Sequence, residues 1–183
     1  MSISGTVHSL SHERSVHMDI IHKLNDWLTA HDHNIEYRKT DIAVCKNPVL
    51  CKFENIEKLK TLIEFWNFFQ KVVSSDTCAW FLCEQDFKAE YNASEFAWNE
   101  FEKISLSAAA DTDERNRVTE WWSKHLPIAM SVRGEYSFLA IDLGENFGSI
   151  VYGCEPEFEE TSVIARDFDD LIGQIISGSF SWL

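Results

Sequence analysis

The chain has 183 residues, enough for one domain with a full core, and 45% of them are apolar, including 13 Phe and 7 Trp. Its 30 acidic residues outnumber its 16 basic ones, so the formal net charge is −14. Because phosphate contacts need clustered Lys and Arg, this balance excludes direct electrostatic binding to DNA or RNA, and an anionic membrane surface would also repel the chain.

The N-terminal segment and the cysteines indicate the compartment. Residues 1–14 are polar and lack apolar periodicity, so they are predicted to be a flexible tail ahead of a single domain at 15–183. They contain no secretory signal, and the chain has no apolar run of membrane-spanning length. Five cysteines, an odd number with no C-x-x-C pair, fit free thiols in a reducing compartment. We therefore expect a cytoplasmic protein.

The first predicted helix begins after Ser15, a favourable N-cap residue, and runs to about Ala30. Its apolar face is formed by residues at helical spacing, namely Val16, Ile20, Leu24, Trp27 and Leu28. Turn-forming residues at 31–34 end this pattern, and two short strands are predicted at 35–38 and 42–46, before the turn pair Asn47-Pro48.

A broad apolar pattern over residues 53–73 predicts one long helix that ends at Ser74-Ser75-Asp76. The continuous apolar run AWFLC at 79–83 then predicts a buried strand. Residues 91–106 are less regular, and they are interpreted as a loop, a short helix at 94–101 and a strand at 103–106.

The C-terminal part has the clearest signals. Asp111 with Glu114 predicts a capped helix whose end is marked by Pro127. Segments 128–132, 136–143, 149–153 and 161–165 have the spacing of an antiparallel meander. Asp167 is the expected N-cap of a closing helix with Gly178 after its end, and its apolar positions are Phe168, Leu171, Ile172, Ile175 and Ile176. The predicted fold class is α+β, with a central, mostly antiparallel sheet of about five to six strands flanked by helices in a single domain.

The sequence patterns do not favour a metal site or a catalytic nucleophile. The histidine pairs, His8 with His12 and His31 with His33, have no third ligand nearby. The cysteine pairs, Cys45 with Cys51 and Cys78 with Cys83, do not have the spacing of a zinc site. No G-x-S-x-G elbow, P-loop or G-x-G-x-x-G run occurs. The sequence thus indicates no catalytic residue, metal or cofactor.

Two local features allow a functional and a structural interpretation. Asp142 and Glu145 flank Gly144, where they could act as a carboxylate pair or bind a divalent cation, or could simply form a solvated turn. Trp121 and Trp122 are adjacent and point about 100° apart on a helix, so one is expected in the core. The other is expected to be partly covered or, alternatively, to be an exposed interface anchor.

Acidic residues are concentrated towards the C-terminus, with ten acids and one base, Arg166, between Glu135 and Asp170. One interpretation is a solvated loop followed by helix-cap charges. The other is a docking surface for a basic partner, which could also imitate nucleic-acid phosphates, with one apolar contact inside a charged ring. The residues predicted to bind the partner are Glu145, Glu155, Glu157, Phe158, Glu159, Glu160, Asp167, Asp169 and Asp170.

The run WWSKHLPIA, the following GEYSFLAIDLGENFGSIVYG and then SVIARDFDDLIGQI resemble the SUKH (Smi/Knr-like) superfamily. Members have a tryptophan before a proline strand entry, a Y-x-x-L-x-I-D strand, a glycine turn into G-x-I-V, and a late helix start. The matching positions are Trp122, Pro127, Tyr136, Leu139, Ile141, Asp142, Gly148, Ile150, Val151, Val163, Ala165, Asp167, Phe168 and Leu171. The pattern covers about a third of the chain, and the superfamily's N-terminal motifs are missing.

The resemblance implies an α+β fold and a role in binding rather than catalysis. Bacterial members resemble immunity proteins of polymorphic or contact-dependent toxin systems, which bind and neutralise a toxin domain, often a nuclease or a deaminase. We therefore expect a cytoplasmic immunity protein whose partner is a cognate, basic toxin. A regulatory or scaffold adaptor for a housekeeping protein is the alternative, and an enzyme that uses carboxylates such as Asp142 and Glu145 is a weaker one.

Overall fold

The computed structural model describes residues 5–88 and 96–181, except for the side chains of residues 5–16 and 45. The helices are α1 (Gly5–Ala30), α2 (Lys60–Phe68), α3 (Glu100–Ala108), α4 (Thr112–Ser123) and α5 (Phe168–Ser177). The strands are β1 (Asn34–Tyr37), β2 (Phe69–Val73), β3 (Ala79–Phe81), β4 (His125–Ser131), β5 (Ser137–Asp142), β6 (Ile150–Cys154) and β7 (Ser162–Ala165).

All seven strands belong to one open antiparallel sheet in which each strand pairs with the next one along the chain. The predicted fold class, a single α+β domain with an antiparallel sheet flanked by helices, is therefore confirmed, with seven strands in place of five or six. The sheet leaves two edges, β1 and β7, at its opposite ends.

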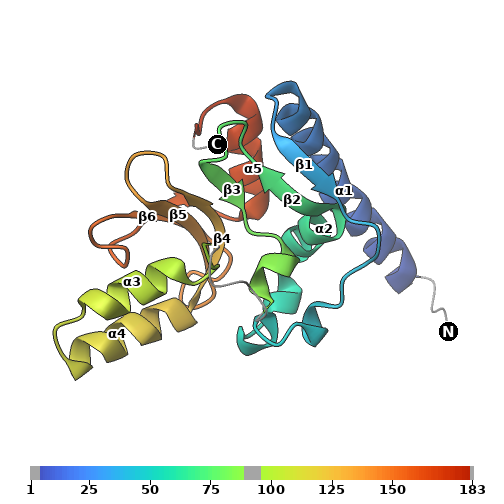
Figure 1. Cartoon of the computed structure of the whole chain (residues 1–183). Coiled ribbons are helices and arrows are strands. Elements are labelled where there is room, and N and C mark those ends of the chain that lie inside the picture. The colour runs from blue at the N-terminus through green and yellow to red at the C-terminus, as the bar shows by residue number, and fades with distance from the viewer. Residues whose placement is uncertain (1–4, 89–95, 182–183) are drawn as a thin grey trace.

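Helices cover both faces of the sheet (Figure 1). On one face, Phe65 of α2 packs against Phe81 of β3 and Phe168 of α5. On the other face, Phe138 of β5 packs against Phe101 of α3 and Trp122 of α4. Because both faces are covered, residues 126–131 of β4 and all of β5 are buried, which explains their nearly continuous apolar sequences.

Gly153 lets two of these layers approach closely. It pairs with Phe138 across the sheet, and a Cβ atom placed on it would lie 2.5 Å from the Phe138 ring and 2.7 Å from the carbonyl oxygen of Phe158. No real Cβ atom tolerates such contacts, so glycine at this position allows the segment after β6 to fold back over the sheet.

The N-terminal half differs from its prediction in three places. Helix α1 begins at Gly5 instead of after Ser15, since an established helix can extend through polar residues by adding one hydrogen bond per residue. Residues 42–46, predicted as a strand, contain the 3₁₀ turn Val44–Lys46. The long helix predicted over 53–73 ends at Phe68, and Phe69–Val73 forms β2.

Two predictions in the middle of the chain are also wrong. Residues 103–106 belong to helix α3 and not to a strand, while residues 91–95 of the same ambiguous segment lie outside the described residues. Pro127 does not mark the end of α4, because that helix stops at Ser123 and β4 begins at His125. Proline is tolerated inside β4 because the register with β5 shifts between Pro127 and Ala129.

The helix boundaries that rest on side-chain caps are confirmed. Asp111 accepts a hydrogen bond from the backbone N–H of Glu114, and Asp167 accepts one from that of Asp170, both at 2.8 Å. Gly178 ends α5 with φ 73°, a left-handed conformation that favours glycine. Short-range chemistry therefore fixes these positions independently of the tertiary fold.

Candidate functional site

The acidic residues predicted to bind a partner lie at both ends of the β6–β7 pair. Cys154 pairs with Ser137 at one end of β6, and Ile150 pairs with Ala165 at the other. The connection over residues 155–161 therefore carries the hairpin glutamates at one end, namely Glu155, Glu157, Glu159 and Glu160. The cap aspartates, namely Asp167, Asp169 and Asp170, begin α5 at the opposite end, where Glu145 also lies in the β5–β6 turn.

Two of the hairpin glutamates also hold the hairpin in place. Glu155 accepts a hydrogen bond from the backbone N–H of Tyr136 at 3.1 Å, and Glu159 accepts one from the indole N–H of Trp122 at 2.6 Å. Glu157 and Glu160 are exposed. Among the described residues, no Lys or Arg forms an ion pair with any of the four, so their negative charge is not compensated locally.

Phe158 does not lie on the surface, so the prediction that it is an exposed apolar contact is wrong. Its side chain is only 2% exposed, and its ring stacks on Phe101 at a centroid distance of 4.8 Å and approaches Phe138. A large aromatic ring in an otherwise polar loop gains most by turning towards the core. Phe158 therefore anchors the hairpin to the core, and this anchor fixes the position of the glutamates beside it in the loop.

The cap aspartates mainly serve the start of α5. Besides the cap made by Asp167, Asp170 accepts a hydrogen bond from the backbone N–H of Arg166 at 3.0 Å and pairs with its guanidinium at 3.3 Å. The backbone bond and then the side-chain bond from Arg166 lower the pKa of Asp170. Asp169 lies 3.6 Å from the imidazole of His17. This end of the surface is therefore more compensated than the hairpin.

Asp142 and Glu145 do not form a paired-carboxylate site. Asp142 is only 8% exposed, and its two oxygens accept hydrogen bonds from the backbone N–H groups of Gly144 at 2.6 Å and Asn146 at 3.2 Å. Glu145 is exposed on the same turn. The residues form the turn that the second interpretation expected, but Asp142 is buried in it as an acceptor for the backbone and is not solvated.

The tryptophan pair divides as expected between core and surface. Trp122 is 4% exposed, whereas Trp121 is partly exposed and stacks on His125 at 3.7 Å. The His125 Nδ1 atom lies 2.8 Å from the carbonyl oxygen of Trp121. Burial lowers the pKa of His125, with smaller opposing effects from the Trp121 carbonyl and Asp142.

The sequence prediction overlooked that this arrangement occurs twice. Trp27 and His31, at the end of α1, stack at 4.1 Å, and the His31 Nδ1 atom lies 2.7 Å from the Trp27 carbonyl oxygen. The shared W-x-x-x-H pattern was a readable signal, because a histidine four residues after a tryptophan at a helix end can stack on the ring and satisfy an orphan carbonyl.

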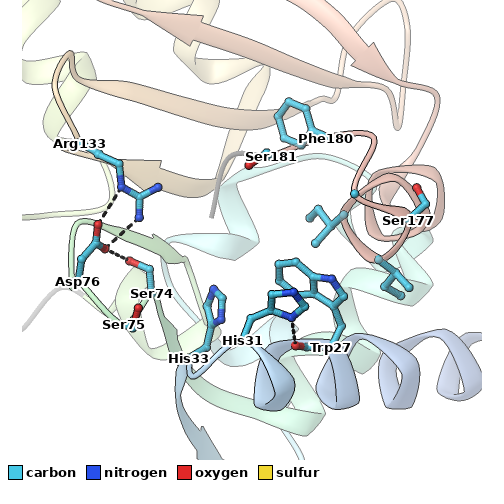
Figure 2. A pocket seen from close by; sticks show the side chains of 13 residues that line it. Trp27, His31, His33, Ser74, Ser75, Asp76, Arg133, Ser177, Phe180 and Ser181 are labelled. Carbon is cyan, nitrogen blue, oxygen red and sulfur yellow. Dashed lines mark hydrogen bonds and ion pairs between the residues drawn. The ribbon is translucent and has the colours of Figure 1, made fainter.

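The Trp27–His31 stack forms one wall of a cavity of about 640 Å³, shown in Figure 2. The opposite wall carries Arg133, whose guanidinium pairs with Asp76 through contacts of 2.8 and 2.9 Å. His33 lies between the two walls, and both of its ring nitrogens are buried without a hydrogen-bond partner. Burial lowers the pKa of His33, so the neutral ring is favoured there.

Two further cavities lie elsewhere. One of about 350 Å³ is lined by His17, Thr61 and Asp169, and both contacts of His17 use the same nitrogen, Nδ1. A catalytic relay would use the two different ring nitrogens, so this cluster lacks that geometry. The other, of about 650 Å³, contains Arg38 beside the buried carboxylate of Glu84, at 3.4 Å.

In the part of the chain whose side chains are described, the candidate metal ligands form no cluster. Within residues 5–88 and 96–181, no group of three or more His, Cys, Asp or Glu side chains is placed to bind a metal ion. Burial raises the pKa of the Cys83 thiol, as expected of a core cysteine. His8, His12 and Cys45 have side chains outside the described set. Among the described helices, none is both long and apolar enough to span a bilayer.

No protein family, curated protein or solved structure matches the chain.

Proposed function

We propose that this chain is a cytoplasmic immunity protein that binds a basic toxin domain and neutralises it by covering its substrate-binding surface. The hairpin glutamates carry this proposal. Their four negative charges have no cationic partner among the described residues, and Phe158 and Trp122 hold their loop in one position. A fixed, uncompensated group of charges is suited to recognising a partner of opposite charge.

The chemistry of the partner follows from the charge. A domain that acts on nucleic acid presents Lys and Arg where the phosphates bind. Carboxylates arranged on a rigid loop can occupy such a surface in place of phosphates, which would block access to the substrate. The net charge of −14 also accelerates the encounter with a basic partner.

The resemblance to the SUKH superfamily supports the same proposal. The strand positions of that pattern, Leu139, Ile141, Ile150 and Val151, are buried on β5 and β6. The adaptor alternative would use the same acidic surface for a housekeeping protein. The enzyme alternative loses its best candidate pair, because Asp142 is occupied by its own turn.

The test is co-expression with the toxin domain encoded beside the gene, together with association kinetics of the two purified proteins. The chain should protect cells from that toxin. Replacing the two exposed hairpin glutamates, as Glu157→Gln with Glu160→Gln, should slow association several-fold and reduce its dependence on salt.

The matched control is Asp19→Asn with Asp26→Asn, which removes the same charge from exposed positions on α1. It should leave the association rate close to that of the unmodified protein. If the chain neither binds the toxin nor protects against it, the immunity proposal is wrong. A growth defect on deletion in cells never exposed to toxin would favour the adaptor.

A further inference from the structure

We infer that the partner inserts a basic, extended segment along β7, where it adds an eighth strand to the sheet. This inference rests on the proposed function and specifies how the same acidic surface is used. It follows from the position of β7, from the exposure of its residues and from the charges at its two ends.

Strand β7 is one of the two edges of the sheet. An edge strand presents backbone N–H and C=O groups on its outer side, which another strand can pair with. Ser162 and Val163 are exposed, and Val163, at 61%, is more exposed than Tyr37 at 51% and Phe147 at 39%. An apolar side chain there gains contacts only when something covers it.

One side-chain hydrogen bond already occupies a backbone group of β7 and limits where another strand can pair. The side-chain amide of Gln174 donates a hydrogen bond to the carbonyl oxygen of Ile164 at 3.0 Å. The part of β7 left for an incoming strand is therefore Ser162 and Val163, which precede this bond and lie next to the hairpin. Successive residues of a strand point their backbone groups in opposite directions, so one of these two residues presents its N–H and C=O groups outward.

Charge identifies the incoming segment. The hairpin glutamates lie at one end of β7 and the cap aspartates at the other, separated by a strand of only four residues, or about 13 Å. Arg166 is the one base between Glu135 and Asp170, and it already pairs with Asp170. An extended peptide along β7 would place the side chains at its hairpin end against the uncompensated hairpin glutamates, which favours Lys and Arg there.

The same charges argue against a second copy of this chain. Antiparallel pairing of two β7 strands would place the hairpin glutamates of one copy beside the cap aspartates of the other. Parallel pairing would place each group beside its equivalent. Both arrangements bring negative charges together at two places, and like charges across an interface are costly.

The opposite edge has different chemistry. On β1, Glu36 already pairs with Lys71, the Tyr37 hydroxyl donates to Asn25 of α1, and the exposed Lys39 lies two residues after the strand. A basic segment would meet like charges there. The β1 edge thus provides an internal control for the β7 edge.

The experiment uses a short synthetic peptide of alternating Lys and Val as the probe, with the full chain. A second peptide has the same sequence and charge but carries N-methyl groups on alternate backbone amides, which removes strand hydrogen bonding. The unmodified peptide should bind about tenfold or more tightly than the methylated one and should slow amide exchange at Ser162 or Val163.

Two variants locate the site. Val163→Lys should weaken peptide binding about tenfold or more, whereas Tyr37→Lys, which adds the same charge to the other edge, should change it little. Thermal unfolding of both variants checks that they are folded. Equal binding of the two peptides, an equal effect of the two variants, or dimerisation of the chain through β7 would overturn the inference.

The outcomes separate the two proposals. If the toxin binds and cells are protected, but neither the toxin nor the peptide protects Ser162 or Val163 from exchange, the strand-addition inference fails and the immunity proposal stands. If the peptide pairs with β7 while the toxin is not neutralised, the immunity proposal fails and the edge remains a site for basic strands.

Discussion

His125 couples the end of α4 to the pH of the solution. Its ring is partly buried against Trp121, and burial lowers its pKa below the ordinary value of about 6.5. The unfolded chain therefore takes up a proton before the folded one does as the pH falls. The resulting loss of stability begins near pH 6.5 and continues down to the lowered pKa of the folded state.

We predict that His125→Gln flattens the dependence of the free energy of unfolding on pH between pH 7 and 5. The decrease attributable to this one group cannot exceed about 1.4 kcal/mol per pH unit. Urea unfolding at several pH values measures it, and His33, whose pKa burial also lowers, would retain part of the slope. Identical slopes in the two proteins would contradict the prediction.

Two glycines offer an opposed pair of substitutions. Gly153→Ala should destabilise the protein by about 1–3 kcal/mol, because the new methyl group would meet the Phe138 ring and the Phe158 carbonyl. Gly173→Ala, in the middle of α5 with open space around it, should stabilise by about 0.5–1 kcal/mol. Chemical denaturation compares them, and a loss at both positions would show that the helix site is less open than described.

At the scale of the element, the start of α5 combines a cap and a charge in Asp167. Asp167→Ala should cost about 1 kcal/mol of stability, because the backbone N–H of Asp170 loses its acceptor. Asp167→Asn keeps an effective cap and removes the charge, so it should cost much less. Thermal and urea unfolding decide between them, and equal losses would mean that the charge and not the cap stabilises this end of α5.

Elements with their own local signals were predictable from sequence. Helix α5 has an N-cap, a regular apolar face and a terminal glycine, and strands β5 and β6 are bounded by turn residues. Strand β2 was not, because Phe69–Val73 continues the apolar spacing of α2 and becomes a strand through pairing with β1 and β3. The secondary structure of such a segment is set by its pairing with distant strands, and the apolar spacing of the sequence does not reveal that pairing.

The candidate site was predictable in composition and not in arrangement. The run from Glu155 to Asp170 revealed the acids, but only the register of β6 with β7 separates them into two groups at opposite ends. Phe158 looked exposed because its sequence neighbours are charged, yet the rings of Phe101 and Phe138 come from distant parts of the chain to bury it. The cavity beside His33 likewise depends on four separate segments.

For the whole molecule, charge is distributed unevenly. Residues 38–60 contain six bases and three acids, whereas residues 111–183 contain 14 acids and five bases. The recorded ion pairs are mostly exposed, so each contributes little to stability. The dominant long-range term is therefore repulsion among the acids, which the fold tolerates and which a basic partner would relieve.

We predict that added salt stabilises the free protein. Raising the ionic strength from about 0.01 to 0.15 M shortens the screening length from about 30 to about 8 Å, which weakens repulsion across the surface more than it weakens the few close pairs. The free energy of unfolding should rise by roughly 1 kcal/mol, and Glu157→Gln with Glu160→Gln should reproduce part of the rise at low salt. Urea unfolding in NaCl and in KCl at equal ionic strength excludes an effect of one particular ion. A decrease of stability with salt would mean that the ion pairs outweigh the repulsion among the acids. The hairpin glutamates would then be compensated in the free protein and would not be available to a partner.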